Sequence, residues 1–263
     1  MLINQTEIKS YAIKVIKKYN LSYPLDIHGF VSTLGFEVRF VDTGKCDAYT
    51  IIVNGQKLML LNQQIESQSR INFTLAHELG HYFIPEHMEP IYACNIDELE
   101  PGNRTVNKKE EKEADLFASE LLLPSRFIEK KSIRRLQDII SVAQTYNISI
   151  PAVAIRMMEY SYDNVAFVCC KNNKIEWYAT SLGFKEHLIL KDLNRLSIPE
   201  LSLMNKCIEN NSTISKGKIP AYVWLENMDS SSYIEEEALY YSKYKTGYIL
   251  ISADDLGSIQ YLV

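Results

Sequence analysis

Residues 77–81 read His77-Glu78-Leu79-Gly80-His81, an H-E-x-x-H pattern inside a stretch with helical periodicity. Histidines four residues apart lie one above the other on a helix, so both imidazoles can reach one zinc ion. The glutamate after the first histidine lies near the open position of such an ion, where it can act as general base on water. Only 5 histidines occur in 263 residues, so this spacing favours a hydrolytic metal centre over two incidental histidines in a core helix.

The flanking sequence predicts that this pattern lies on one amphipathic helix. Ser67 offers an N-cap, and Ile71, Leu75 and Leu79 recur at the spacing that gives a helix an apolar face. Pro85 marks the end of the helix, because a proline disfavours helical backbone in the residue before it. Both histidines and the glutamate are therefore expected on a single rigid element.

A catalytic zinc site needs a third protein ligand and keeps its fourth position for water. His87 lies six residues after His81, as in the longer pattern H-E-x-x-H-x-x-G-x-x-H. The glycine position of that pattern holds Ile84, a β-branched residue unsuited to positive φ, and Pro85 follows it. His87 is therefore the less favoured of two candidates for the third ligand.

Glu111 is the favoured third ligand. It lies on a second predicted helix, residues 110–123, where it borders an apolar stripe one turn before Asp115. Asp115 can then orient a ligand histidine by accepting a hydrogen bond from its other ring nitrogen. Glu110 and Glu113 are predicted to face solvent, as runs of charge usually do, with Glu113 as the substitute ligand if the helix is rotated.

Two stretches, residues 70–81 and 111–124, resemble the ImmA/IrrE metallopeptidases. The resemblance covers about residues 25–160 and implies a zincin-like domain of gluzincin type in a cytoplasmic protein. Members of that family characterised as peptidases cut helix-turn-helix repressors and so switch on mobile elements or stress responses. The resemblance therefore implies a role in transcription regulation, with a helix-turn-helix repressor as the protein partner.

The same resemblance implies a role for each matching residue of this sequence. His77, His81 and Glu111 correspond to the ligands of one zinc ion, and Glu78 corresponds to the catalytic acid and base. Asp115 stands where the family carries asparagine or aspartate.

A donor for the oxyanion of the transition state is also required. His87 and Tyr82 are candidates close to the H-E-x-x-H pattern, and Tyr49 and Tyr92 are further ones. The sequence does not choose among these four residues.

The predicted fold is α+β in three parts: the zincin-like domain at 1–124, a helix-turn-helix-like segment at 125–161, and a small sensor or interaction domain at 162–263. Asn54-Gly55 predicts a hairpin turn, and the strand before it is a candidate edge for an extended substrate, although an ordinary sheet strand explains it equally well. Helices are predicted over residues 6–19, 25–34, 126–131, 133–146, 149–160 and 199–210, and strands over 36–41, 48–53, 57–61, 165–170, 174–180, 221–225, 237–241 and 247–252.

The helix-turn-helix-like segment does not indicate a DNA reader. It carries six basic and three acidic residues between positions 126 and 159, a local charge of 6 − 3 = +3. A DNA-binding module usually shows a clear basic patch, and the whole chain has a net charge of −5. A helical pair that packs on the peptidase domain or on a partner is the preferred interpretation, and nucleic acid is the lesser alternative.

Composition narrows the class of protein further. The chain is 46% hydrophobic and 23% charged, as globular proteins with a real core are. No apolar run reaches the roughly 18–20 residues of a membrane span, and the N-terminus carries no signal pattern. The 5 cysteines are odd in number and include no C-x-x-C pair, so reduced thiols and a cytoplasmic location are expected.

Three hypotheses for function follow. The first is a zinc endopeptidase that hydrolyses a peptide bond in a repressor. The second is a regulator that binds a repressor or DNA without proteolysis, with His87 as a fourth ligand of a closed zinc site. The third is a peptidase that acts as a toxin or defence effector, which shares the chemistry of the first and differs in its target.

Overall fold

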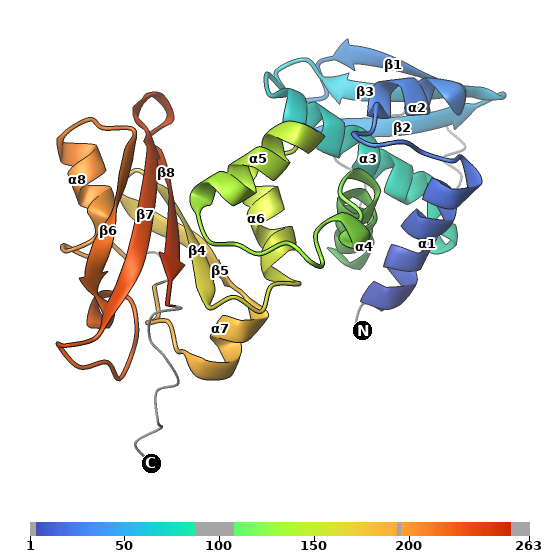
Figure 1. Ribbon diagram of the computed structural model, residues 1–263. Coiled ribbons are helices and arrows are strands. Elements are labelled where there is room, and N and C mark those ends of the chain that lie inside the picture. The colour runs from blue at the N-terminus through green and yellow to red at the C-terminus, as the bar shows by residue number, and fades with distance from the viewer. Residues whose placement is uncertain (1–3, 88–107, 194–195, 254–263) are drawn as a thin grey trace. The chain divides into compact units, whose positions relative to one another are not determined.

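The computed structural model of this chain describes residues 4–87, 108–193 and 196–253. The chain forms two compact units, residues 1–125 with 143–149 and residues 126–142 with 150–263. Both units combine helices with a small sheet, so the α+β prediction is confirmed (Figure 1). The predicted helix-turn-helix-like segment 125–161 is divided between the two units, with α5 (Leu136–Tyr146) contributing to both.

The first unit holds a three-stranded sheet of order β1-β3-β2, in which β1 runs parallel and β2 antiparallel to β3. The hairpin predicted at Asn54-Gly55 is confirmed, and both residues of the turn have positive φ. The elements of this unit are α1 (Gln5–Lys18), α2 (Ile27–Thr33), β1 (Phe36–Val41), β2 (Ala48–Val53), β3 (Gln56–Asn62), α3 (Gln68–Phe83), η1 (Pro85–His87) and α4 (Lys108–Leu122). The short 3-10 turn η3 (Ser125–Phe127) spans the boundary between the two units.

One apolar core joins α3, α4 and the sheet. Met59 and Leu61 of β3 are fully buried, as are Leu75 and Leu79 of α3 and Phe117 of α4. Burying each such side chain contributes about 1.5–3 kcal/mol relative to leaving it exposed. This core fixes α3 and α4 side by side, and both helices carry the residues singled out by the sequence.

The second unit holds a five-stranded antiparallel sheet of order β5-β4-β8-β7-β6. Helix α8 packs against β6 and β7, and α6 packs against β4 and β5 (Figure 1). The elements of this unit after α5 are α6 (Ile150–Met158), β4 (Val165–Lys171), β5 (Lys174–Thr180), α7 (Leu182–His187), α8 (Leu203–Glu209), β6 (Ile214–Pro220), η4 (Ala221–Val223), β7 (Tyr233–Tyr241), η5 (Ser242–Tyr244) and β8 (Thr246–Ser252).

Two predicted elements of this region are wrong. The helix expected over residues 126–131 is absent, and only a short 3-10 turn, η3, lies there. The strand expected over 221–225 is the 3-10 turn η4, because Ala221 begins a turn that buries Trp224 instead of continuing the sheet. The strand in that part of the chain is β6, which ends where the expected one begins.

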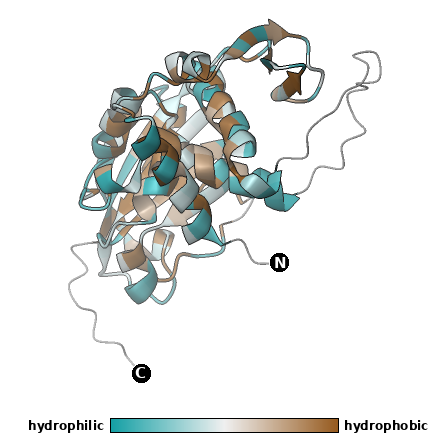
Figure 2. Cartoon of the chain, turned by 90° about the vertical axis from the view of Figure 1, so that its right-hand side faces the viewer, coloured by the Kyte–Doolittle hydropathy of each residue, from teal (hydrophilic) through white to brown (hydrophobic). Residues whose placement is uncertain are grey.

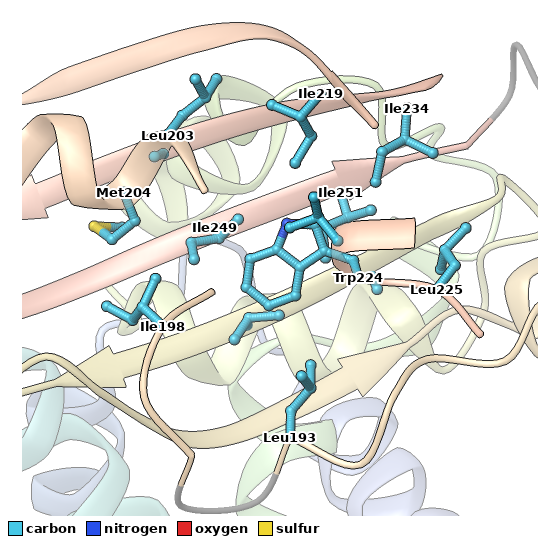
Figure 3. Close-up of a cluster of buried hydrophobic side chains, with 14 of the residues drawn as sticks. Leu193, Ile198, Leu203, Met204, Ile219, Trp224, Leu225, Ile234, Ile249 and Ile251 are labelled. Atoms are coloured by element: carbon cyan, nitrogen blue, oxygen red, sulfur yellow. The ribbon is translucent and has the colours of Figure 1, made fainter. Parts of the chain in front are cut away.

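Trp224 fills the centre of the core of the second unit (Figure 3). Its side chain is fully buried, and its Nε1–H donates to Oε2 of Glu236 at 2.6 Å. The other oxygen of that carboxyl accepts from the Ser202 hydroxyl at 2.7 Å. Burial raises the pKa of Glu236, although its hydrogen bonds oppose the shift. Trp224, Ser202 and Glu236 therefore connect η4 and the start of α8 to the middle of β7.

Replacing Trp224 by alanine is expected to destabilise the protein by about 3–5 kcal/mol, because it leaves a cavity and removes a donor from a buried carboxyl. Tyr222→Ala is the matched control, since Tyr222 lies in the same turn and is 39% exposed. Its expected cost is within about 0.5 kcal/mol. Urea unfolding of both variants measures the difference, and equal losses would contradict the central position of Trp224.

No helix in the described ranges is both long and apolar enough to cross a membrane. Hydrophobic and hydrophilic residues alternate along the helices in Figure 2, as expected for helices that bury one face.

Candidate metal centre

Helix α3 carries the H-E-x-x-H residues as the sequence predicts. Its apolar face, with Leu75 and Leu79, is buried in the core, and this fixes the direction of the opposite face. The side chains of His77 and His81 are 14% and 17% exposed, so both rings lie mostly out of solvent. The helix ends at Phe83, two residues before Pro85.

Three side chains from two helices converge on one point. Nε2 of His77 lies 3.1 Å from Nε2 of His81 and 3.2 Å from Oε2 of Glu111. Nε2 of His81 lies 3.6 Å from Oε1 of Glu111. The ligand atoms of all three residues lie within 4.8 Å of one another, and within the described ranges this is the group that could hold a metal ion. The structure therefore brings together the three residues that the sequence selects.

Asp115 lies behind the first histidine, with its Oδ1 2.9 Å from Nδ1 of His77. An ionised carboxylate only accepts, so Nδ1 of His77 carries the proton and Nε2 carries the lone pair. Burial alone would lower the pKa of His77, but the hydrogen bond to Asp115 and the charges of Glu78, Asp115 and Glu111 outweigh it and raise the pKa. The ring is thus held with its lone pair directed at Glu111 and His81.

The donor set fits a zinc ion. Two imidazole nitrogens and one carboxylate oxygen are the ligands found in catalytic zinc sites of the His₂Glu kind. Electron-rich atoms that lie this close together repel one another unless a cation or a proton lies between them. His77, His81 and Glu111 would hold the ion, and a fourth position would remain for water.

Gly80 allows α4 to approach α3 closely enough for Glu111 to reach the histidines. A Cβ placed on Gly80 would lie 2.9 Å from Cα of Ala114 and 3.1 Å from its carbonyl oxygen. Contacts under 3.0 Å with backbone force one helix to shift. The glycine inside the H-E-x-x-H pattern is therefore a packing requirement of the site, which the sequence reasoning missed.

Gly80→Ala is expected to move α4 away from α3, to weaken zinc binding about tenfold or more, and to cost about 1–3 kcal/mol of stability through overpacking. Competition with a chromophoric chelator measures the zinc affinity. Gly217→Ala is the control, because a Cβ there would meet only Leu203 Cδ1 at 3.6 Å, an ordinary contact. An unchanged affinity for Gly80→Ala would show that the approach of the helices does not position Glu111.

Glu78 lies beside the cluster and is 9% exposed. Its Oε2 accepts a hydrogen bond of 2.6 Å from the Thr50 hydroxyl, which comes from β2 at the edge of the sheet. Sequence reasoning missed Thr50. The available signal was its place in the predicted strand, where alternation puts Thr50 on the opposite face from Tyr49 and Ile51.

Thr50→Val is expected to lower kcat/KM for peptide cleavage by about threefold to tenfold, since one hydrogen bond that orients Glu78 is worth about 0.5–1.5 kcal/mol. Thr50→Ser keeps the hydroxyl and is expected to retain the wild-type rate. Zinc content should stay unchanged in both variants. Equal rates for the valine and serine variants would exclude an orienting role for this hydroxyl.

His87 does not join the cluster. Its Nδ1 lies 3.1 Å from Nδ1 of His81, and its Nε2 lies 3.0 Å from Oε2 of Glu113. The prediction that Glu113 faces solvent is wrong: it is 4% exposed, because η1 places His87 against it. Burial would raise the pKa of Glu113, but its bonds to His87 and Lys109 lower it.

The tyrosines proposed as oxyanion donors are engaged elsewhere. The Tyr82 hydroxyl accepts from Nζ of Lys57 at 2.9 Å. The Tyr49 hydroxyl donates to the Thr43 carbonyl at 3.4 Å, on the opposite face of β2 from Thr50. Tyr92 lies outside the described residues.

Comparisons with known proteins agree with this geometry. The family described as the IrrE N-terminal-like domain matches residues 31–158. Metallopeptidase ImmA of Bacillus subtilis (strain 168) is 33% identical over 73 residues, which are 28% of this chain and 38% of that protein. The chain therefore spans less than two-fifths of the length of this curated relative.

A solved structure, a Mycobacterium tuberculosis transcriptional regulator, shares the fold. It superposes with a TM-score of 0.56 at 13% identity, over 94% of this chain and 76% of that chain. The matched family segment contains both the H-E-x-x-H helix and the helix of Glu111. Residues 31–158 are therefore a domain of the ImmA/IrrE family of metallopeptidases.

Proposed function

We propose that this protein is a zinc-dependent endopeptidase. The observation that carries the proposal is the convergence of His77, His81 and Glu111 within 4.8 Å, with Glu78 on α3, the helix of the two histidines. We assign the two histidines and Glu111 as zinc ligands and Glu78 as the catalytic acid and base. Family membership supports the same reaction class.

Zinc, when bound, supplies the Lewis acidity that makes a water molecule more acidic and a peptide carbonyl more electrophilic. Glu78 takes the proton from the attacking water and later delivers it to the leaving amine. Thr50 holds the carboxylate of Glu78 in place from the edge strand. Asp115 keeps His77 in the tautomer that presents Nε2.

The geometry gives no support to an oxyanion donor among His87, Tyr82 and Tyr49. The ring nitrogens of His87 face His81 and Glu113, and the Tyr49 hydroxyl donates to Thr43. The Tyr82 hydroxyl accepts from Lys57, and its ring packs edge-on against Phe36 of β1. The group that stabilises the oxyanion is therefore not assigned to any of these three.

We further propose that the substrate is an exposed segment of a helix-turn-helix repressor. The family resemblance is the ground for this choice, and β2 supports an extended peptide as the form that is bound. β2 is an edge strand, and its Thr50 contacts Glu78, so a peptide added along β2 would pass beside the catalytic glutamate.

The test is co-expression of the chain with a panel of helix-turn-helix repressors, followed by mass spectrometry of their fragments. Wild-type protein should yield one defined cut, and Glu78→Gln should yield none. Cleavage of an unrelated cytoplasmic protein instead would move the assignment to a peptidase toxin or defence effector, which uses the same chemistry. If the repressors stay intact but lose DNA binding with both the wild-type and the Glu78→Gln protein, the non-proteolytic regulator is favoured.

The geometry disfavours that non-proteolytic alternative in its closed-site form. A closed site requires His87 as fourth ligand, but Nδ1 and Nε2 of His87 are directed at His81 and Glu113.

A further inference from the structure

A buried pair of side chains, His87 and Glu113, lies behind one histidine of the metal centre. The side chain of His87 is 0% exposed and that of Glu113 is 6% exposed. Lys109, one turn before Glu113 on α4, has its Nζ 3.3 Å from Oε1 of that carboxylate and stabilises its negative charge. Neither residue belongs to the group of three that could hold the metal ion.

The chemistry of the two groups fixes the directions of the hydrogen bonds. The Glu113 carboxylate can only accept, so Nε2–H of His87 is the donor across the 3.0 Å distance. A neutral imidazole carries one proton, so Nδ1 of His87 is an acceptor and Nδ1–H of His81 donates to it across 3.1 Å. His81 then carries its lone pair at Nε2, the atom that faces His77 and Glu111.

We propose that His87 and Glu113 are positioning residues that fix the orientation and tautomer of His81, so that its Nε2 is directed at the zinc ion. This inference rests on the proposed zinc centre. Asp115 does the same for His77 through one direct bond, whereas His81 is reached through a second imidazole.

Helix geometry explains why a second imidazole is needed between Glu113 and His81. Glu111 and Asp115 are four residues apart and share the face of α4 that meets the histidines. Glu113 is two residues from each and lies about 200° around the helix, so its carboxylate is on the other side. The 3-10 turn η1 carries His87 to the space between Glu113 and His81.

We call the chain of hydrogen bonds from Glu113 through His87 to His81 the relay, and its burial makes it hard to replace. The side chain of Asp115 is 53% exposed, so water can substitute for part of its bond to His77. His87 and Glu113 are shielded from solvent, so removing either leaves a buried polar group without its partner. We therefore expect the loss of His87 to weaken zinc binding at least as much as the loss of Asp115.

Zinc affinity, measured by competition with a chromophoric chelator, tests the relay. His87→Phe is expected to weaken binding by about 10–100-fold, the effect of losing a partner of a metal-ligating histidine. His87→Gln offers an amide oxygen to Nδ1–H of His81 and is expected to recover most of the affinity. His187→Phe is the control, because His187 is exposed and lies in the second unit.

Nitrogen NMR of the histidine rings in metal-free wild-type protein adds a readout that needs no variant. At a pH where the rings are neutral, His81 should be in the Nδ1–H form and His87 in the Nε2–H form. The opposite form of either ring would overturn the relay even if the variants fail to fold.

The outcomes separate the two proposals. Wild-type protein that binds no zinc contradicts the zinc centre itself. If the wild-type protein binds zinc, two results contradict only the relay. One is an unchanged zinc affinity in folded His87→Phe, and the other is an affinity of His87→Gln as weak as that of His87→Phe.

Discussion

Glu78→Gln is expected to lower kcat for peptide-bond hydrolysis by about 10²–10⁴-fold, the range that a general acid–base group contributes. The amide cannot take a proton from water, while its size and its contact with Thr50 can remain. Glu78 is absent from the three-residue cluster, so zinc content should match that of the wild type. Single-turnover cleavage of a defined substrate, with zinc analysis of the same sample, measures both quantities.

Two variants complete this measurement. Glu86→Gln is the control for a nearby glutamate, because Glu86 is exposed and lies on η1 rather than α3. It should cleave at the wild-type rate. A Glu78→Gln protein that still cleaves at that rate would remove Glu78 from the mechanism.

Glu111→Ala is expected to weaken zinc binding by more than about 100-fold, beyond the 10–100-fold expected for groups that only orient a ligand. The reason is that Glu111 supplies the one carboxylate of the cluster, with Oε2 3.2 Å from His77 and Oε1 3.6 Å from His81. Elemental analysis and chelator competition measure stoichiometry and affinity. Activity should be lost together with the metal.

Glu110→Ala is the matched control for this prediction. It removes the same charge from the same turn of α4, and Glu110 does not belong to the cluster. If both variants bind zinc as the wild type does, the third ligand is not Glu111. If both lose zinc, the first turn of α4 acts through its charge rather than through one coordinating oxygen.

Local periodicity predicted much of the first unit. The strand 36–41 and the hairpin around Asn54-Gly55 occur where alternation and turn chemistry place them. The convergence of Glu111 with the histidines also followed from pattern, since a residue beside an apolar stripe must face the element that covers the stripe.

Other parts of the site depend on contacts between distant segments, which a pattern does not contain. Glu113 belongs to a charged run and was expected in solvent, but η1 packs His87 onto it. Gly80 occupies an unspecified position of the H-E-x-x-H pattern, and its packing role is visible only in the fold, where Ala114 lies against it. Thr50 is 28 residues from Glu78, so only the folded sheet brings the hydroxyl to the carboxylate.

The errors in the second unit have a similar cause. Residues 221–225 are rich in strand-forming side chains, but burial of Trp224 against Glu236 favours a turn there. β6 contains lysines and Gly217, which weaken its strand pattern, yet it pairs along its whole length with β7 as an edge strand. Tertiary packing overrides propensity at both places.

X-ray absorption at the zinc edge of the purified protein is the most direct test of the proposed centre. His77, His81 and Glu111 as ligands predict a shell of nitrogen and oxygen at about 2.0–2.1 Å, with the scattering of two imidazole rings. Three imidazole rings would place His87 on the metal and contradict both the ligand set and the relay. Sulfur in the shell, or no zinc in the protein, would contradict the zinc centre altogether.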